Sequence, residues 1–213
     1  RKHPTVNVDK ILSKSISFDG EYCVCANGAQ FKKDIRGFLP ELMEKIYNER
    51  VTFKKKMLVA KQENEKNPSA QLEKDISTYN NIQMARKIQL NSAYGALGNK
   101  YFRYFKLANA EAITLSGQVS IRWIENKVNE YLNTLLKTED VDYVIASDTD
   151  SIYLNLGPLV TKFFSNRIDD KAAIVSILNK VCQDKLEPFI TESYEELAEY
   201  LSTYDQKMIM KRE

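Results

Sequence analysis

The sequence predicts an α+β fold, in which an antiparallel sheet is backed by helices and an antiparallel helical hairpin is inserted into the chain. Three patterns support this prediction. Residues 143–154 alternate as strand, acidic turn and strand; two long helical stretches are separated by a short polar break; and a short β-hairpin precedes those helices. The 213 residues suffice for one large domain or two small ones.

The first regular element is a β-hairpin. Residues 1–20 show no strong period and suit a loop with a short strand. Residues 22–25 and 29–32 then flank Asn27 and Gly28. Asn-Gly tolerates positive φ at both central positions, so the sequence predicts two strands joined by a type I′ turn.

Two long helices follow. Pro40 suits a first helical turn and opens a helix of roughly 25 residues. Residues 64–69 form a polar break that contains Asn67 and Pro68, and a second helix runs over about 72–97. Two long helices joined by a short turn predict an antiparallel hairpin. The apolar positions expected on the first helix are Leu42, Met43, Ile46, Tyr47, Phe53, Met57 and Leu58.

The second half of the chain alternates between helices and strands. A third helix is expected over about 108–136, and residues 143–146 and 152–154 are typical of strands. Gly157 and Pro158 end the strand unit. Helical patterns then resume over 159–164 and 170–200, with Pro188 interrupting the latter, and residues 208–210 suit a final strand.

Composition limits the function classes. Hydrophobic content of 43% and charged content of 28% are typical of a soluble folded protein, and no apolar run reaches membrane-spanning length. The net charge is only +2, so any nucleic-acid contact must come from local clusters. The single histidine, His3, excludes a metal site built from several histidines. Cys23, Cys25 and Cys182 suit free thiols in a reducing, intracellular compartment.

An acidic turn is the first candidate site. Asp148 and Asp150 alternate with Thr149 between two apolar strands, and alternation places positions i and i+2 on one side of a strand. Two adjacent carboxylates repel, and a hard cation such as Mg²⁺ offsets that repulsion because it prefers oxygen ligands. The alternatives are an ordinary exposed turn, and the Asp-x-Asp motif that glycosyltransferases use to bind the metal of a nucleotide sugar.

The helical hairpin carries the second candidate site. Arg50 and Lys54 are four residues apart, and so are Lys87 and Asn91, with Tyr94 following on the same face. At ~1.5 Å per residue, Arg50 and Lys87 both lie about 15 Å from the base of the hairpin. Two cations at the same distance from the base of the hairpin can bind one polyphosphate together. The alternative is a solvated face of Lys and Arg.

A basic and aromatic run follows the hairpin. Arg103 and Lys106 are interleaved with four aromatic residues. Such a run suits contact with a template strand, although aromatic residues of this kind more often pack in a core. The aromatic residues are Tyr101, Phe102, Tyr104 and Phe105.

Both candidate sites resemble motifs of one enzyme family. The pattern Lys-x-x-x-Asn-Ser-x-Tyr-Gly, from Lys87 to Gly95, resembles motif B of the family B DNA polymerases. Asp148-Thr-Asp-Ser resembles their motif C. Asn99-Lys-Tyr-Phe-Arg and the segment from Asn109 to Gln118 are similar to the replicative polymerases of T-even-like bacteriophages. The resemblance covers nearly the whole chain, from about residue 22 to 213.

The resemblance implies a palm domain with inserted fingers. Residues 40–99 would form the fingers, and residues 1–39 and 100–213 the palm. Arg50 and Lys87, assisted by Lys54, would bind the triphosphate of the incoming nucleotide. Lys87 would also donate a proton to the leaving pyrophosphate, because a Lys beside phosphate oxygens is placed for general-acid work.

The resemblance also implies a two-metal site beside the nascent base pair. Asn91, Tyr94 and Gly95 would line that base pair. Asp148 and Asp150 would be catalytic metal ligands, with Asp150 binding both metals and Asp148 beside it. Glu213 aligns with a third acidic residue near the metals. The ions would be two Mg²⁺, for which Mn²⁺ can substitute.

Two departures from the family pattern limit the prediction. Ala146 and Ser147 stand where the family has Tyr-Gly before the acidic pair. Motif A, Asp-x-x-Ser-Leu-Tyr-Pro-Ser, is absent from the sequence, and it would supply a further metal-binding Asp. We therefore expect a palm-and-fingers fragment that is inactive by itself.

The expected parent protein is a DNA-directed DNA polymerase. Its partners would be primer–template DNA, deoxynucleoside triphosphates and a sliding clamp, although the clamp would not bind this fragment and no membrane is involved. A phage protein would act in the host cytoplasm. The alternatives are a nucleotide-sugar glycosyltransferase and a non-catalytic nucleic-acid-binding module.

Overall fold

The computed structural model describes residues 3–164 and 170–212, and it divides the chain into two compact units. One unit combines Arg1–Lys33 with Glu111–Glu213, and the other comprises Asp34–Ala110. We call them the core unit and the hairpin unit. The coarse expectation of an α+β fold is confirmed, because long helices accompany two small antiparallel sheets.

The chain enters the core unit through a short helix instead of the expected strand. Helix α1 spans Val8–Leu12, and the Asn7 side chain caps it by accepting a hydrogen bond from the Lys10 N–H. Strands β1 (Tyr22–Val24) and β2 (Gln30–Lys32) then pair antiparallel.

The turn between β1 and β2 is not the predicted type I′ turn. Gly28 has a φ of +80°, but Asn27 is not among the residues with positive φ. The Gly28 N–H donates to the Cys25 carbonyl, and the Cys25 N–H donates to the Ala29 carbonyl. The loop is therefore three residues long with glycine in the left-handed position, and the Asn27 carboxamide instead accepts from the Ala29 N–H.

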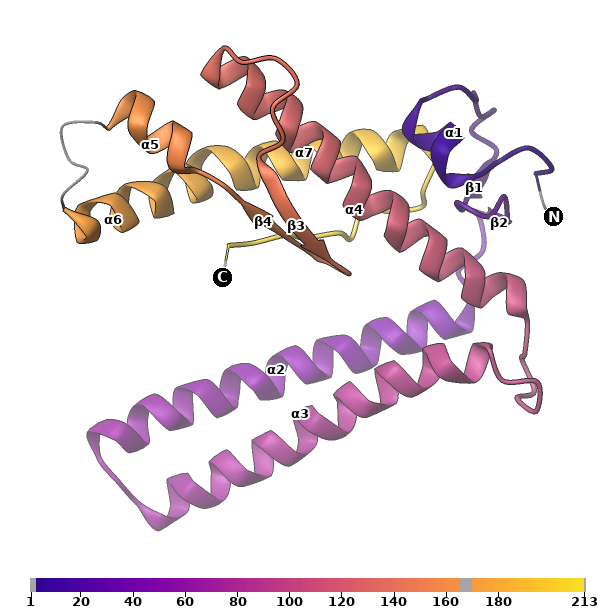
Figure 1. The fold of residues 1–213 in the computed structure, drawn as a ribbon. Coiled ribbons are helices and arrows are strands. Elements are labelled where there is room, and N and C mark those ends of the chain that lie inside the picture. The colour runs from indigo at the N-terminus through magenta and orange to yellow at the C-terminus, as the bar shows by residue number, and fades with distance from the viewer. Residues whose placement is uncertain (1–2, 165–169, 213) are drawn as a thin grey trace. The chain divides into compact units, whose positions relative to one another are not determined.

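The hairpin unit consists mainly of two long antiparallel helices (Figure 1). Helix α2 spans Phe38–Lys66 and includes Pro40 in its first turn, as predicted. Helix α3 spans Ala70–Leu97 and begins at Ser69, whose hydroxyl accepts from the Leu72 N–H. Three of the apolar positions expected to pack, Leu42, Tyr47 and Leu58, are exposed.

The remaining elements complete the core unit. Helix α4 spans Leu107–Leu136, and strands β3 (Val144–Asp148) and β4 (Ser151–Leu154) form a second antiparallel hairpin. Helix α5 (Gly157–Phe163) begins at the Gly-Pro pair that was expected only to end the strand unit, because proline fits the first helical turn. The two strand hairpins stay separate sheets within the described residues, where one sheet was expected.

One long helical stretch follows residues 165–169. Helix α6 (Lys171–Val181), a π-helical segment (Cys182–Leu186) and α7 (Glu187–Tyr200) run consecutively. Pro188 lacks an N–H and displaces the normal helical hydrogen bonding, so the interruption predicted there takes the form of a π-helical turn. The strand expected over residues 208–210 is wrong, because these residues form no regular structure.

A single hydrophobic cluster holds the core unit together. Helix α4 supplies Trp123 and the fully buried Val119, Ile124, Val128 and Leu132. The Trp123 indole N–H donates to the Ser193 carbonyl of α7 over 2.9 Å, so the two helices are joined by a directed bond as well as by packing. Among the described residues, no helix is long and apolar enough to cross a membrane.

Candidate active site

The acidic turn lies at the exposed end of the β3–β4 hairpin. Asp148 is the last residue of β3 and pairs with Ser151, so Thr149 and Asp150 form the turn itself. The two carboxylates therefore do not share a strand face, which alternation had predicted, because Asp150 lies outside the strand. Both carboxylates are nevertheless exposed at the same hairpin end.

Local hydrogen bonds orient the Asp148 side chain. The Thr149 hydroxyl donates to Asp148 Oδ1 over 3.0 Å. The Asp150 N–H donates to the Asp148 carbonyl over 2.6 Å, and Thr149 has a φ of +53°. An i to i+2 bond around a β-branched residue with positive φ is a rare, strained conformation. The backbone thus folds sharply between the two carboxylates.

The charge of this turn acts on a tyrosine of helix α7. The side chain of Tyr194 is buried, and burial is the main reason that the pKa of its hydroxyl is raised to about 12. The negative charge of Asp150 raises that pKa further, because it disfavours a second negative charge on the tyrosine. Tyr194 was not predicted, because a tyrosine at a helical core spacing carries no signal of a neighbouring turn.

The carboxylates fit a hard divalent cation only in part. Carboxylate oxygens are the ligands that Mg²⁺ prefers, and both side chains are accessible. Within the described part of the chain, no group of three or more potential ligands from His, Cys, Asp and Glu comes together. The third expected acidic ligand, Glu213, lies outside the described residues. Asp148 and Asp150 could thus supply only part of such a site, and water or phosphate would complete it.

In the hairpin unit, the less exposed residues of α2 and α3 recur at alternating spacings of three and four. We call these residues the seam. The Phe53 and Tyr79 rings lie 6.1 Å apart across it, and Glu49 pairs with Arg86 at 2.7 Å. The seam comprises Met43, Ile46, Arg50, Phe53, Met57 and Ala60 of α2, with Leu72, Ile76, Tyr79, Gln83, Arg86 and Leu90 of α3.

The two predicted triphosphate cations lie at the same level of the hairpin but in different surroundings. Their immediate neighbours, Glu49 and Arg86, form the cross-helix ion pair. Lys87 is exposed. Arg50 lies in the seam, and its Nε atom is buried without a hydrogen-bond partner among the described residues. Arg50 and Lys87 thus lie at the same height along the hairpin, as predicted. Arg50 and Lys54 do not share one face, because Arg50 lies in the seam and Lys54 is exposed.

The residues expected beside a base pair lie on the exposed side of α3. Asn91 is exposed, and the Tyr94 side chain is 46% exposed. A Cβ added at Gly95 would meet no atom within 4 Å, so the surface is open at that point. This stretch leaves room for a flat ligand next to the tyrosine ring.

The aromatic run after α3 was expected mainly in a core, and this expectation was wrong for three of its four rings, whereas Phe102 is half-buried. Tyr101 is 85% exposed, Tyr104 47% and Phe105 41%. Arg103 lies 5.8 Å from the Tyr104 ring, and Lys100 lies 5.0 Å from the Tyr101 ring. Rings and cations alternate on an accessible surface, which is the composition of a stacking surface for unpaired bases.

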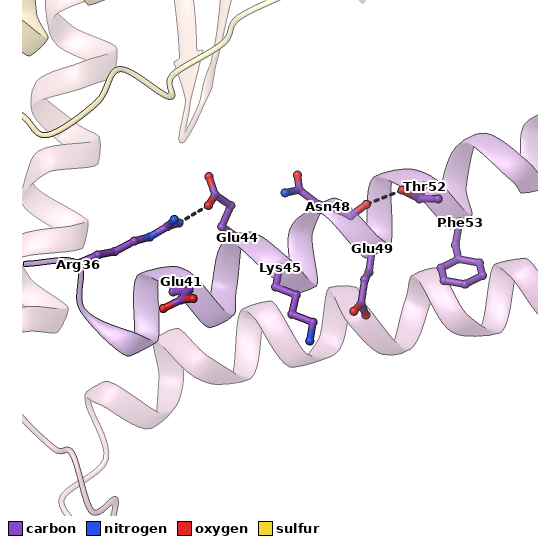
Figure 2. Close-up of a pocket in the computed structure, with 8 residues that line it drawn as sticks. All are labelled: Arg36, Glu41, Glu44, Lys45, Asn48, Glu49, Thr52 and Phe53. Atoms are coloured by element: carbon purple, nitrogen blue, oxygen red, sulfur yellow. Dashed lines mark hydrogen bonds and ion pairs between the residues drawn. The ribbon is translucent and has the colours of Figure 1, made fainter.

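A shallow depression along the first half of α2 does not coincide with the predicted nucleotide site. Figure 2 shows its lining, in which Arg36 reaches Glu44 as an ion pair. Glu41 and Glu49 add further negative charge, and Lys45 adds one cation. A lining with more carboxylates than cations does not suit a triphosphate.

Comparisons with known proteins place these motifs in context. Residues 5–187 match the family model of DNA polymerase family B. The DNA-directed DNA polymerases of Enterobacteria phage T4 and Escherichia phage RB69 are each 32% identical, over 91% and 90% of this chain. The DNA polymerase alpha catalytic subunit of Arabidopsis thaliana is 31% identical over 70% of the chain and 8% of its own length. The chain spans 26% of the length of each phage relative.

Proposed function

Because this chain belongs to DNA polymerase family B, we propose that it is the palm-and-fingers part of a DNA-directed DNA polymerase. The parent enzyme adds deoxynucleotides to a primer 3′-OH under the direction of a template. The observation that carries the proposal is the exposed acidic turn, with two carboxylates at one hairpin end. Family membership argues against the nucleotide-sugar glycosyltransferase.

The palm role is assigned to the core unit. Asp148 and Asp150 would hold Mg²⁺, together with Glu213 and with the Asp that motif A supplies in the family pattern. Bound Mg²⁺ supplies charge that stabilises the attacking oxygen and the leaving pyrophosphate. The chain's own contribution is to orient the carboxylates, and the bond from the Thr149 hydroxyl to Asp148 Oδ1 supports that role.

The fingers role is assigned to the hairpin unit. Lys87 is exposed and binds the triphosphate of the incoming nucleotide, and it donates a proton to the pyrophosphate as that group leaves. Arg50 binds the same triphosphate, and Lys54 assists both residues. Because the Arg50 Nε atom is buried in the seam, a bidentate contact with a phosphate would use the two terminal nitrogens of its guanidinium.

The end of α3 is assigned to contact with the nascent base pair, and the basic and aromatic run after α3 to contact with the template. Asn91, Tyr94 and Gly95 line the base pair, and the open space at Gly95 supports this role. The exposed ring of Tyr101 and its neighbouring cations favour contact with unpaired template bases over a core role.

Substitution of Lys87 tests the fingers assignment. In the parent polymerase, Lys87→Ala should lower kcat/KM for the incoming nucleotide about 10²- to 10³-fold, because it removes a charge that acts on the developing pyrophosphate. Steady-state primer extension measures this. The matched control is Lys55→Ala, which removes an equally exposed charge from α2 and should change kcat/KM less than about twofold. Equal losses in both variants would refute the assignment.

The isolated chain should not extend a primer. Its sequence contains no motif A, so one metal-binding Asp of the family pattern is missing. Template-dependent synthesis by the 213-residue chain alone would contradict this proposal. A non-catalytic binding module predicts a different result, namely that Asp148→Ala and Asp150→Ala leave both DNA affinity and the parent's activity unchanged.

A further inference from the structure

An ion pair joins the two helices of the hairpin unit next to the residues assigned to the triphosphate. Arg86 Nε of α3 lies 2.7 Å from Glu49 Oε2 of α2. Glu49 immediately precedes Arg50, and Arg86 immediately precedes Lys87. A step of one residue along a helix is ~1.5 Å, so the pair lies at nearly the same height as the two cations. It thus ties α2 to α3 at the level where the triphosphate is proposed to bind.

Both members of the pair are partly shielded from water. The side chains of Arg86 and Glu49 are 33% and 34% exposed, so solvent screens their attraction less than that of a fully exposed pair. A second contact orients the arginine, because its Nη1 donates to Gln89 Oε1 over 2.9 Å. The Arg86 Nε atom is buried without a hydrogen-bond partner among the described residues. Attraction between opposite charges therefore holds Arg86 to Glu49.

The charges specify one alignment of the two helices. A polar or ionic contact between helices fixes their register, because any other alignment would separate the charges. The seam supplies little apolar packing within one turn of the pair, where Arg50 and the buried Gln83 replace apolar residues. A shift of one helix by one turn would move Arg50 and Lys87 about 5.4 Å apart in height. The pair is therefore placed to keep the two cations level.

We propose that the ion pair between Glu49 and Arg86 positions Arg50 and Lys87 so that they bind one triphosphate together. This inference rests on the proposed function, in which Arg50 and Lys87 bind the triphosphate of the incoming nucleotide. Pairing with Arg86 also offsets the negative charge of Glu49, which would otherwise repel an anion bound next to Arg50. Glu49 and Arg86 are positioning residues, because they act through their neighbours and are assigned no contact with the nucleotide.

Removal of the Glu49 charge separates positioning from a direct effect of that charge. Glu49→Gln keeps the shape of the side chain and removes its charge. If Glu49 acted on the nucleotide only through its electric field, the variant would bind the triphosphate more tightly, because a nearby negative charge is lost. If the pair positions the cations, the variant binds the triphosphate more weakly. We expect the Kd of the incoming nucleotide to rise about five- to tenfold.

Single-turnover nucleotide incorporation by the parent polymerase measures that Kd separately from the rate of incorporation. A merely structural role would reduce the amount of active enzyme and leave Kd unchanged. The matched control is Glu44→Gln, because Glu44 is also 34% exposed and forms an ion pair on α2. Its partner Arg36 precedes α2, so this pair does not join α2 to α3. Glu44→Gln should change Kd less than about twofold.

A double-mutant cycle tests whether Glu49 and Arg86 act as one pair. Arg86→Gln should raise Kd as much as Glu49→Gln does. The double variant should raise it no further, because the same contact is lost in all three variants. Exchange of the two charges, Glu49→Arg with Arg86→Glu, restores the attraction and should return Kd to within about threefold of the parent value. Circular dichroism checks that each variant is folded.

Failure of this inference is distinguishable from failure of the proposed function. If Lys87→Ala weakens nucleotide use no more than Lys55→Ala does, the triphosphate site is wrong and both are overturned. If Lys87→Ala acts as expected but Glu49→Gln leaves Kd unchanged or lowers it, only the positioning role is overturned. Additive effects of Glu49→Gln and Arg86→Gln, or an equal rise of Kd in Glu44→Gln, would also overturn that role.

Discussion

The core unit and the hairpin unit are built on opposite principles. The largest fully buried side chains all belong to the core unit, where they join several helices and both strand hairpins in one cluster. In α2 and α3 only Met57, Ala60 and Gln83 are buried. The core unit is thus fixed by hydrophobic packing, whereas the hairpin unit depends on helix length and a seam that contains polar groups.

This difference separates the residues that stabilise the fold from the residues proposed to bind the nucleotide. The proposed nucleotide-binding side chains lie on long helices that bury little, so they can reorient without disturbing a packed core. The proposed metal-binding turn lies instead at the end of a strand hairpin whose base packs in a large cluster. The hairpin unit should therefore unfold at a lower denaturant concentration than the core unit.

A matched pair of leucines should show the largest effect. Leu132 of α4 is fully buried, whereas Leu58 of α2 is 46% exposed. Leu132→Ala should lower the unfolding free energy of the core unit by about 3 kcal/mol, because it leaves a cavity. Leu58→Ala should lower that of the hairpin unit by less than about 0.5 kcal/mol.

Urea unfolding with two probes measures this difference. Trp123 is the single tryptophan and is buried in the core unit, so its fluorescence reports that unit alone. Circular dichroism at the helical band reports both units. The two probes could instead give coincident transitions, or the two leucine variants could have equal effects. Either result would show that the two units do not differ in how they are stabilised.

Removal of a polar group from the seam should have a smaller effect of the opposite sign. The Gln83 side chain is buried, and among the described residues its Nε2 donates only to Asn80 of the same helix. Gln83→Leu should raise the unfolding free energy of the hairpin unit by about 1 kcal/mol, because an apolar side chain suits the seam better. Asn81→Leu, at an exposed position of α3, is the control and should not stabilise the unit.

The circular dichroism transition measures the Gln83 substitution, and the Trp123 transition should stay in place. A destabilised hairpin unit in Gln83→Leu would mean that the polar seam contributes to stability. The two units would then differ in the kind of interaction that stabilises them and not in their unfolding free energy.

The smallest effect is expected from an exposed charge network on the core unit. Glu196 contacts Lys14 and Lys127, with 2.7 Å to the latter, and both lysines lie over the Trp123 ring. Hydrogen bonds from Lys127 and Lys14 lower the pKa of Glu196. A lowered folded-state pKa contributes stability above the unfolded pKa of about 4.5, and that stability is lost as the pH falls through the folded value.

Glu196→Gln should therefore destabilise the core unit at pH 7 by less than about 1 kcal/mol, because the carboxylate is partly exposed. The difference between variant and parent chain should vanish below the folded pKa of Glu196. Trp123 fluorescence during urea unfolding at several pH values checks this. A difference that grows as the pH falls would contradict the assigned sign.

Long-range regularity made most of the fold predictable. The helices around residues 40–66, 70–97 and 107–136 follow from extended apolar spacing, and the Asn67-Pro68 break from the missing proline N–H. The short elements were less predictable. In the Asn27-Gly28 loop, a buried carboxamide bond accompanies the departure from a type I′ turn. The segment 208–210 has strand-like residues but pairs with no strand among the described residues.

The candidate site was predictable in residue type but not in orientation. Spacing indicated that Arg50 and Lys87 have equal height, yet the seam is defined by both helices together, so one helix alone could not place Arg50 inside it. Likewise, alternation suggested that Asp148 and Asp150 share a strand face. Pairing of Asp148 with Ser151 depends on β4, and it moves Asp150 into the turn.

Paramagnetic nuclear magnetic resonance tests the central claim, that the acidic turn is the metal-binding part of a polymerase active site. Mn²⁺ added to the ¹⁵N-labelled chain should broaden the amide signals of residues 148–151 first, and Asp150→Asn should abolish that selectivity. The carboxylates of α2, including Glu63 and Glu65, are the internal control, because they are equally exposed but scattered along a helix. Broadening that begins at those carboxylates, or that is unchanged in Asp150→Asn, would contradict the account.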